Sequence, residues 1–151
     1  MNAKVTLALL TTVTSLALTS GLHADTVPQN FHGAWCYDSD NGGKGTLPNG
    51  YNNLTTRYYR TTGHNRTDIQ CSSDDHEFLS INRKGWIGVE SGCDIATSSV
   101  VGTEDFRPVY EIIFKNCSGE AYTWNEAWRA YIDRDGFLHV RQRVTNQREQ
   151  G

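Results

Sequence analysis

Turn-forming glycine, asparagine and aspartate residues divide this chain into short β-prone runs, and that division favours a sheet of short strands. The clearest case is an apolar run at 78–82 and another at 86–90, separated by Arg83, Lys84 and Gly85. Two such runs around a tight turn are typical of a β-hairpin. The pattern predicts strands at 31–37, 54–60, 78–82, 86–90, 93–101, 109–115, 122–132 and 137–144. We therefore expect an all-β fold, a small antiparallel β-barrel or sandwich of about seven or eight strands.

Residues 122–132 fit two kinds of element. Trp124, Trp128 and Tyr131 have helical spacing, whereas the even-numbered aromatic and apolar residues also alternate as in a strand. An Asp-Gly turn at 133–136 and a further β-prone run follow, so a long hairpin explains both halves and we predict a strand. The segment 38–53 is expected to be a loop with little to bury, 116–119 a turn, and 146–151 a frayed polar tail.

The first 24 residues resemble a secretory signal peptide. A short start containing Lys4 precedes a Leu-, Ala- and Thr-rich run, and small or polar residues end at Ala24. The apolar run is too short and too rich in threonine to span a bilayer as a stable helix. We expect a leader at 1–24 and a single β domain at 25–151, secreted or periplasmic, without a stable membrane anchor.

Four cysteines, Cys36, Cys71, Cys93 and Cys117, lie after this leader. An even number of cysteines in an exported chain predicts two disulfides, and three pairings are open. Cys93 and Cys117 lie on strands that should be neighbours, so a bridge between them is physically possible. There is no C-x-x-C motif, and the spacing does not match a zinc site.

The charge balance argues against nucleic acid as a partner. Loss of Lys4 with the leader would leave 13 Lys and Arg residues against 17 Asp and Glu residues. A net charge of about −4 lacks the basic face that binding to phosphates requires.

Glu126 is the most informative charged residue, because the alternating pattern places it on one strand face with Tyr122, Trp124 and Trp128. If that face points inward, the pKa of the carboxyl rises unless a cation meets it. The candidate partners are Arg57, Arg60, His139 and Arg141. We predict Trp124, Glu126, Trp128, Arg57 and Arg60 as ligand-binding residues, since small-ligand sites combine aromatic walls with a few polar groups. Trp35, Trp86, Trp124 and Trp128 are expected to be largely buried.

Other motifs carry less chemistry. The acidic run 74–77, which includes His76, is interpreted as a solvated turn, and Asp133-x-Asp135-Gly136 as a hairpin turn because it lacks the remaining ligands of a calcium loop. No nucleophile elbow, phosphate loop or HExxH motif occurs. We expect no cofactor and no metal.

The ordered set Phe31-x-Gly33-x-Trp35, Cys71, Glu90-x-x-Cys93, Cys117-x-Gly119-Glu120 and Gly136-x-Leu138 resembles a group of small exported proteins of alphaproteobacteria without established function. The resemblance implies a bacterial source and an exported β-protein. It also implies that Cys71 pairs with Cys93 and Cys36 with Cys117.

Gly33-Ala34-Trp35 is also similar to the first-strand motif of calycins, the lipocalin-like barrels. That resemblance implies that Trp35 closes one end of the barrel, with Arg141 or Arg143 of the last strand stacked on it.

These observations together predict an exported, non-enzymatic binding module for a protein partner or a small ligand. The alternative is a small periplasmic hydrolase or metal-dependent enzyme with its site around Glu126.

Overall fold

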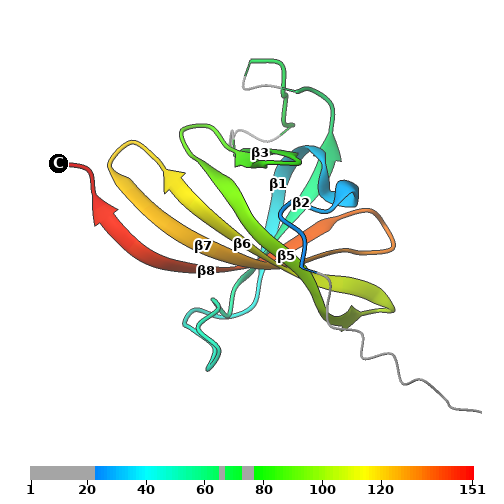
Figure 1. Ribbon diagram of the computed structural model, residues 1–151. Helices are drawn as coiled ribbons and strands as arrows, with labels where there is room; N and C mark the ends of the chain where they lie inside the picture. The colour runs from blue at the N-terminus through cyan, green and yellow to red at the C-terminus, as the bar shows by residue number, and fades with distance from the viewer. Residues whose placement is uncertain (1–22, 65–66, 73–76) are drawn as a thin grey trace, which may run out of the picture.

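Eight antiparallel strands close into a barrel in the computed structural model, which describes residues 23–64, 67–72 and 77–151 (Figure 1). A short 3-10 helix, η1 (Gln29–Phe31), precedes the first strand. The strands are β1 (Gly33–Asn41), β2 (Thr55–Thr61), β3 (Phe78–Asn82), β4 (Gly85–Ile87), β5 (Gly92–Glu104), β6 (Arg107–Ser118), β7 (Tyr122–Ile132) and β8 (Leu138–Glu149). The expected all-β fold and its barrel form are confirmed. Nearly all of the predicted leader and most of the acidic run 74–77 lie outside the described residues.

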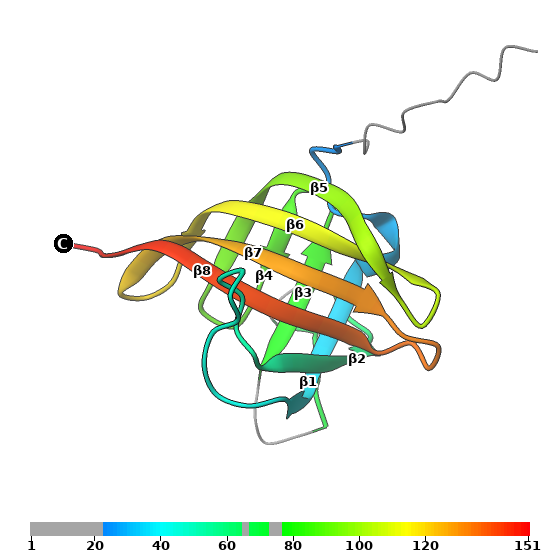
Figure 2. The same cartoon turned by 90° about the horizontal axis from the view of Figure 1, so that it is seen from below.

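The order of the strands around the barrel is β1-β2-β8-β7-β6-β5-β4-β3. From β3 to β8 each strand pairs with the next, while the β1–β2 pair is inserted between β3 and β8 (Figure 2). The connection from β2 to β3 must therefore pass β1. Ile69 and Cys71 of this connection belong to a small apolar cluster with Cys36 and Phe78, so the connection packs against the barrel wall.

The ambiguous segment 122–132 is the strand β7, as predicted. It forms a long hairpin with β8, and residues 133–136 form the turn between them. Oδ1 of Asp133 accepts the backbone N–H groups of Asp135 and Phe137, at 2.9 and 3.0 Å. Oδ2 lies 2.7 Å from Nε2 of His139. Partial burial alone would raise the pKa of the Asp133 carboxyl, but these hydrogen bonds outweigh it and hold the pKa below its usual value. The carboxylate therefore fastens a turn.

Several expected strand ends are wrong, since residues 38–41 belong to β1 and β4 already ends at Ile87. Residues 116–118 belong to β6 instead of a turn, because Asn116 adopts a positive φ of 51° in an irregularity of the pairing and the strand continues beyond it. The tail is not frayed at 146–149, because β8 continues to Glu149, which pairs with Tyr122. Backbone pairing to β7 orders these polar residues although their side chains are exposed.

The segment 38–53 was expected to have little to bury, but Tyr51 lies in it and is almost fully buried. Its side chain is 1% exposed and its hydroxyl donates to Oε2 of Glu111 at 2.7 Å. The guanidinium groups of Arg129 and Arg143 lie 5.0 and 4.8 Å from the centre of its ring. Cation–π contacts of this kind allow a tyrosine to be buried on the outside of a barrel.

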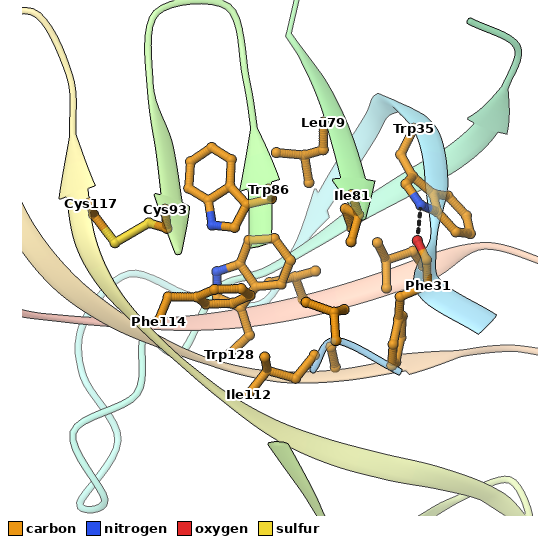
Figure 3. Packing of buried hydrophobic residues seen from close by; sticks show 14 residues of the cluster. Phe31, Trp35, Leu79, Ile81, Trp86, Cys93, Ile112, Phe114, Cys117 and Trp128 are labelled. Carbon is orange, nitrogen blue, oxygen red and sulfur yellow. Dashed lines mark hydrogen bonds between the residues drawn. A yellow bond between two sulfur atoms is a disulfide. The ribbon is translucent and has the colours of Figure 1, made fainter. Parts of the chain in front are cut away.

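Large aromatic and aliphatic side chains pack against one another in the barrel interior (Figure 3). Trp35, Trp86 and Trp128 are 0, 6 and 2% exposed, as predicted, and Trp124 is partly buried. Nε1 of Trp35 donates to the carbonyl oxygen of Phe31 in η1 at 2.8 Å, which holds η1 against the barrel. Arg60 of β2 lies over the Trp35 ring at 4.1 Å, in the position expected for Arg141 or Arg143.

Two disulfides are present, but their pairing differs from the one that the resemblance implied. Cys36 is bonded to Cys71 and Cys93 to Cys117, with Cα–Cα distances of 5.6 and 4.1 Å. The insertion of β1 beside β3 explains the first bridge, since Cys36 is paired with Phe78 and so lies next to the segment that leads into β3. The second joins the neighbouring strands β5 and β6, and it is the bridge that the sequence analysis had found physically possible.

Peptide mapping of the unreduced protein is expected to recover Cys36 linked to Cys71 and Cys93 linked to Cys117. The double variant Cys93→Ser/Cys117→Ser should retain the first bridge and lose about 2–4 kcal/mol of stability, because closing a loop of this size restricts the unfolded chain by that order. A peptide containing Cys71 and Cys93 together would contradict the structure.

Candidate ligand-binding site

Glu126 lies inside the barrel, where the alternation of β7 directs it. Its side chain is 2% exposed, and across the sheet it is paired with Phe114 of β6 and Val144 of β8. Phe114 is fully buried, so the carboxyl group is surrounded by core residues. A charge in such a place requires hydrogen-bond partners.

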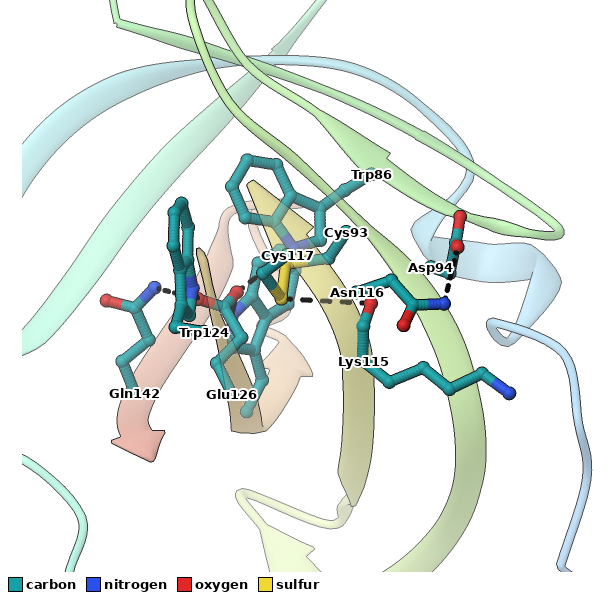
Figure 4. The surroundings of a disulfide bond; sticks show 10 residues. Trp86, Cys93, Asp94, Lys115, Asn116, Cys117, Trp124, Glu126 and Gln142 are labelled. Carbon is teal, nitrogen blue, oxygen red and sulfur yellow. Dashed lines mark hydrogen bonds between the residues drawn. A yellow bond between two sulfur atoms is a disulfide. The ribbon is translucent and has the colours of Figure 1, made fainter. Parts of the chain in front are cut away.

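Four N–H groups provide those partners, and three of them are indoles (Figure 4). Oε1 of Glu126 accepts from Nε1 of Trp86 at 3.0 Å and from Nε1 of Trp128 at 2.7 Å. Oε2 accepts from Nε1 of Trp124 at 2.9 Å and from Nε2 of Gln142 at 3.1 Å. A carboxylate offers about four lone-pair positions, so its accepting capacity is fully used. We call Glu126 and these four donors the indole–carboxylate cluster.

The electrostatic balance at Glu126 is set by burial. Burial raises the pKa of the carboxyl above its usual value, while the hydrogen bonds from the three indoles and Gln142 oppose that rise. The direction agrees with the expectation from the sequence for a carboxyl that no cation meets. The expected cationic partners are wrong, because the described residues that donate to Glu126 are all neutral.

The predicted site residues do not all come together. Trp124, Glu126 and Trp128 share the indole–carboxylate cluster, but Arg57 and Arg60 are engaged elsewhere. Arg57 forms a salt bridge with Asp38 at 2.6 Å and lies over the ring of Phe137. Arg60 donates to the carbonyl oxygens of His32 and Asn30, at 2.7 and 2.9 Å. Both arginines therefore fasten segments of the chain to β2.

The other two expected partners of Glu126, Arg141 and His139, also form their hydrogen bonds with other residues. Nη2 of Arg141 donates to Oγ1 of Thr55 at 3.1 Å, and His139 contacts Asp133. The strand β2, which contains Arg57 and Arg60, is not an edge strand, because it pairs with β1 and with β8. Closure of the barrel therefore determines where the side chains of β2 and β8 point.

The disulfide between Cys93 and Cys117 lies beside Glu126. Their sulfur atoms and a carboxylate oxygen lie within 4.8 Å of one another, a spacing that could suit a metal ion. Thiolate sulfur is the metal ligand, however, and both sulfurs are already bonded to each other. In the disulfide these sulfurs are not thiolate ligands, and the bridge joins β5 to β6 in the barrel wall.

A solvent-accessible cavity of 430 Å³ opens next to the indole–carboxylate cluster. Trp86, Trp128 and Gln142 belong to both, so they donate to Glu126 and also line the cavity. Its other lining residues are Asn52, Leu54, Thr56, Tyr58, Glu77, Phe78, Leu79, Gly88, Val89, Glu90, Ser91 and Val140. Its volume is in the range of small-molecule sites.

Sequence reasoning missed three residues of this site. Tyr58 and Gln142 were not among the predicted site residues, and Trp86 was expected only to be buried. The alternation of β8 contained a signal, since Leu138 and Val140 are buried and Gln142 follows on the same face. Nothing local indicates that Trp86 of β4 reaches a carboxylate of β7, because that contact depends on the curvature of the closed sheet.

Comparisons with known proteins add no assignment. No protein-family model matches the chain, and no curated protein or solved structure is significantly similar to it. In the described part of the chain, no helix has the length and apolar character needed to cross a membrane.

Proposed function

We propose that this protein is an exported, non-enzymatic binding module that holds a small molecule in the barrel cavity. The observation that carries the proposal is the cavity of 430 Å³ with walls formed by Tyr58, Trp86 and Trp128. Rigid aromatic walls with a few polar groups are the usual composition of a small-ligand site. Export is supported by the two disulfides, since such bonds persist in oxidising compartments.

The state of Glu126 favours binding over catalysis. A general acid or base must exchange a proton with a substrate, which requires an accessible oxygen within hydrogen-bond reach. Each of the two carboxylate oxygens of Glu126 already accepts two N–H groups, and Glu126 does not line the cavity. Its role in the proposed function is to position Trp86 and Trp128.

Native mass spectrometry of the protein isolated from its own cells tests the proposal. We expect a retained small-molecule mass in the wild type and its loss in Thr56→Trp, whose side chain would fill the cavity that Thr56 lines. Thr103→Trp is the matched control, because Thr103 is exposed on β5 and does not line the cavity. Equal retention by both variants, or a wild type that carries a protein partner and no small molecule, would contradict the proposal.

A further inference from the structure

The indoles that line the cavity have already used their polar groups. An indole has one donor and no acceptor, and the N–H groups of Trp86 and Trp128 are both directed to Glu126. Figure 4 shows Trp86, Trp124 and Gln142 turned toward this carboxylate. These tryptophans therefore offer a ligand only ring carbon, and their electron-rich rings attract cations. One face of each is already covered, because the two rings stack with their centroids 5.7 Å apart.

Among the described residues that line the cavity, the two charged side chains are both acidic. Glu77, just before β3, and Glu90, after β4, line the cavity and are exposed to solvent. No Lys, Arg or His is found among the described residues that line it. An anionic ligand would be repelled by these two negative side chains, whereas a cation would be attracted at the mouth.

The raised pKa of Tyr58 is consistent with a negative electrostatic potential inside the cavity. Burial is the largest cause that raises the pKa of its phenol, and the negative charges of Glu77, Asp40 and Glu126 raise it further. Tyr58 lines the cavity, so an added positive charge there would lie within the field of the same carboxylates.

We propose that the ligand of this cavity is a compact organic cation, an alkylated ammonium group held against Trp86, Trp128 and Tyr58, with Glu77 and Glu90 at the entrance. This inference rests on the proposed function and specifies its ligand class. The alkyl groups would displace water from the indole faces, and the charge would gain cation–π attraction without needing hydrogen-bond donors from the protein. Quaternary ammonium groups are suited to such a surface because they have no N–H to satisfy.

Choline and its neutral carbon isostere, 3,3-dimethylbutan-1-ol, form a matched pair of probes that differ mainly in charge. Titration of the full chain, followed by tryptophan fluorescence, is expected to give saturable binding of choline at least about tenfold tighter than that of the alcohol. The double variant Glu77→Gln/Glu90→Gln should weaken choline binding by about tenfold. Glu104→Gln is the control, since Glu104 is exposed on β5 and does not line the cavity.

The outcomes distinguish a failure of this inference from a failure of the proposed binding function. Equal binding of choline and the alcohol, abolished by Thr56→Trp, would overturn the charge preference and leave the binding function intact. A neutral or anionic molecule retained in native mass spectrometry, with no choline binding, would do the same. Absence of any small-molecule binding by either method would overturn both proposals.

Discussion

Replacing Glu126 with alanine is expected to lower the free energy of unfolding by about 3–5 kcal/mol. The change removes the acceptor of three indole N–H groups and the Gln142 amide. Each buried donor left unpaired costs about 1–3 kcal/mol, and removal of a buried charge offsets part of the sum. Chemical denaturation at neutral pH, with both disulfides intact, measures the loss.

Two further variants show whether the acceptor itself is responsible. Glu126→Gln keeps the size of the side chain but turns one accepting oxygen into an N–H donor that faces other donors, so its stability should lie between those of the wild type and Glu126→Ala. Glu120→Ala removes an exposed carboxylate near the start of β7 and should change stability by less than about 0.5 kcal/mol. An alanine variant of Glu126 as stable as Glu120→Ala would refute the structural role of the indole–carboxylate cluster.

Replacing Trp35 with alanine is expected to cost about 3–5 kcal/mol, the usual range for truncating a large aromatic residue in a core. Trp35 is fully buried, and its loss would leave a cavity and remove both the hydrogen bond to Phe31 and the surface on which Arg60 lies. The measurement is the midpoint and slope of the denaturation curve, since a lower midpoint at an unchanged slope reports stability alone.

A conservative variant of Trp35 and a variant of an exposed aromatic residue provide the comparison for the loss of stability in Trp35→Ala. Trp35→Phe retains an aromatic ring but loses the N–H group, so a loss of about 1–2 kcal/mol is expected. Tyr122→Ala removes an aromatic residue that is 39% exposed and should have a small effect. If Trp35→Ala were no more destabilising than Tyr122→Ala, Trp35 would not be an essential part of the barrel core.

Local patterns were sufficient to predict the fold class and the β7–β8 hairpin. The Asp-Gly turn at 133–136 resolved the ambiguity of 122–132, and alternation along β7 placed Glu126 with Trp124 and Trp128. Such patterns repeat within a few residues, so a single strand contains all the information that they need.

Features that depend on closure of the sheet could not be predicted in this way. The expected meeting of Glu126 with an arginine failed, because Trp86 of β4 reaches it across the barrel interior. The pairing of Cys36 with Cys71 depends on β1 lying beside β3. Tyr51 is buried because distant strands present Arg129 and Arg143 to it. Each contact joins residues far apart in the sequence, where residue spacing contains no signal.

The insertion of β1 and β2 between β3 and β8 has a consequence for the order in which the chain folds. Strands β3 to β8 are neighbours both in sequence and in space, so each pairing closes only a short loop. The seam between β2 and β8 instead joins Thr56 to Val140 and must wait for a much larger loop to close. We therefore expect closure of this seam to be the late, slow step, and Thr56 and Val140 both line the cavity. In that order of events, the cavity is completed only when the β1–β2 pair docks on a sheet that has already formed.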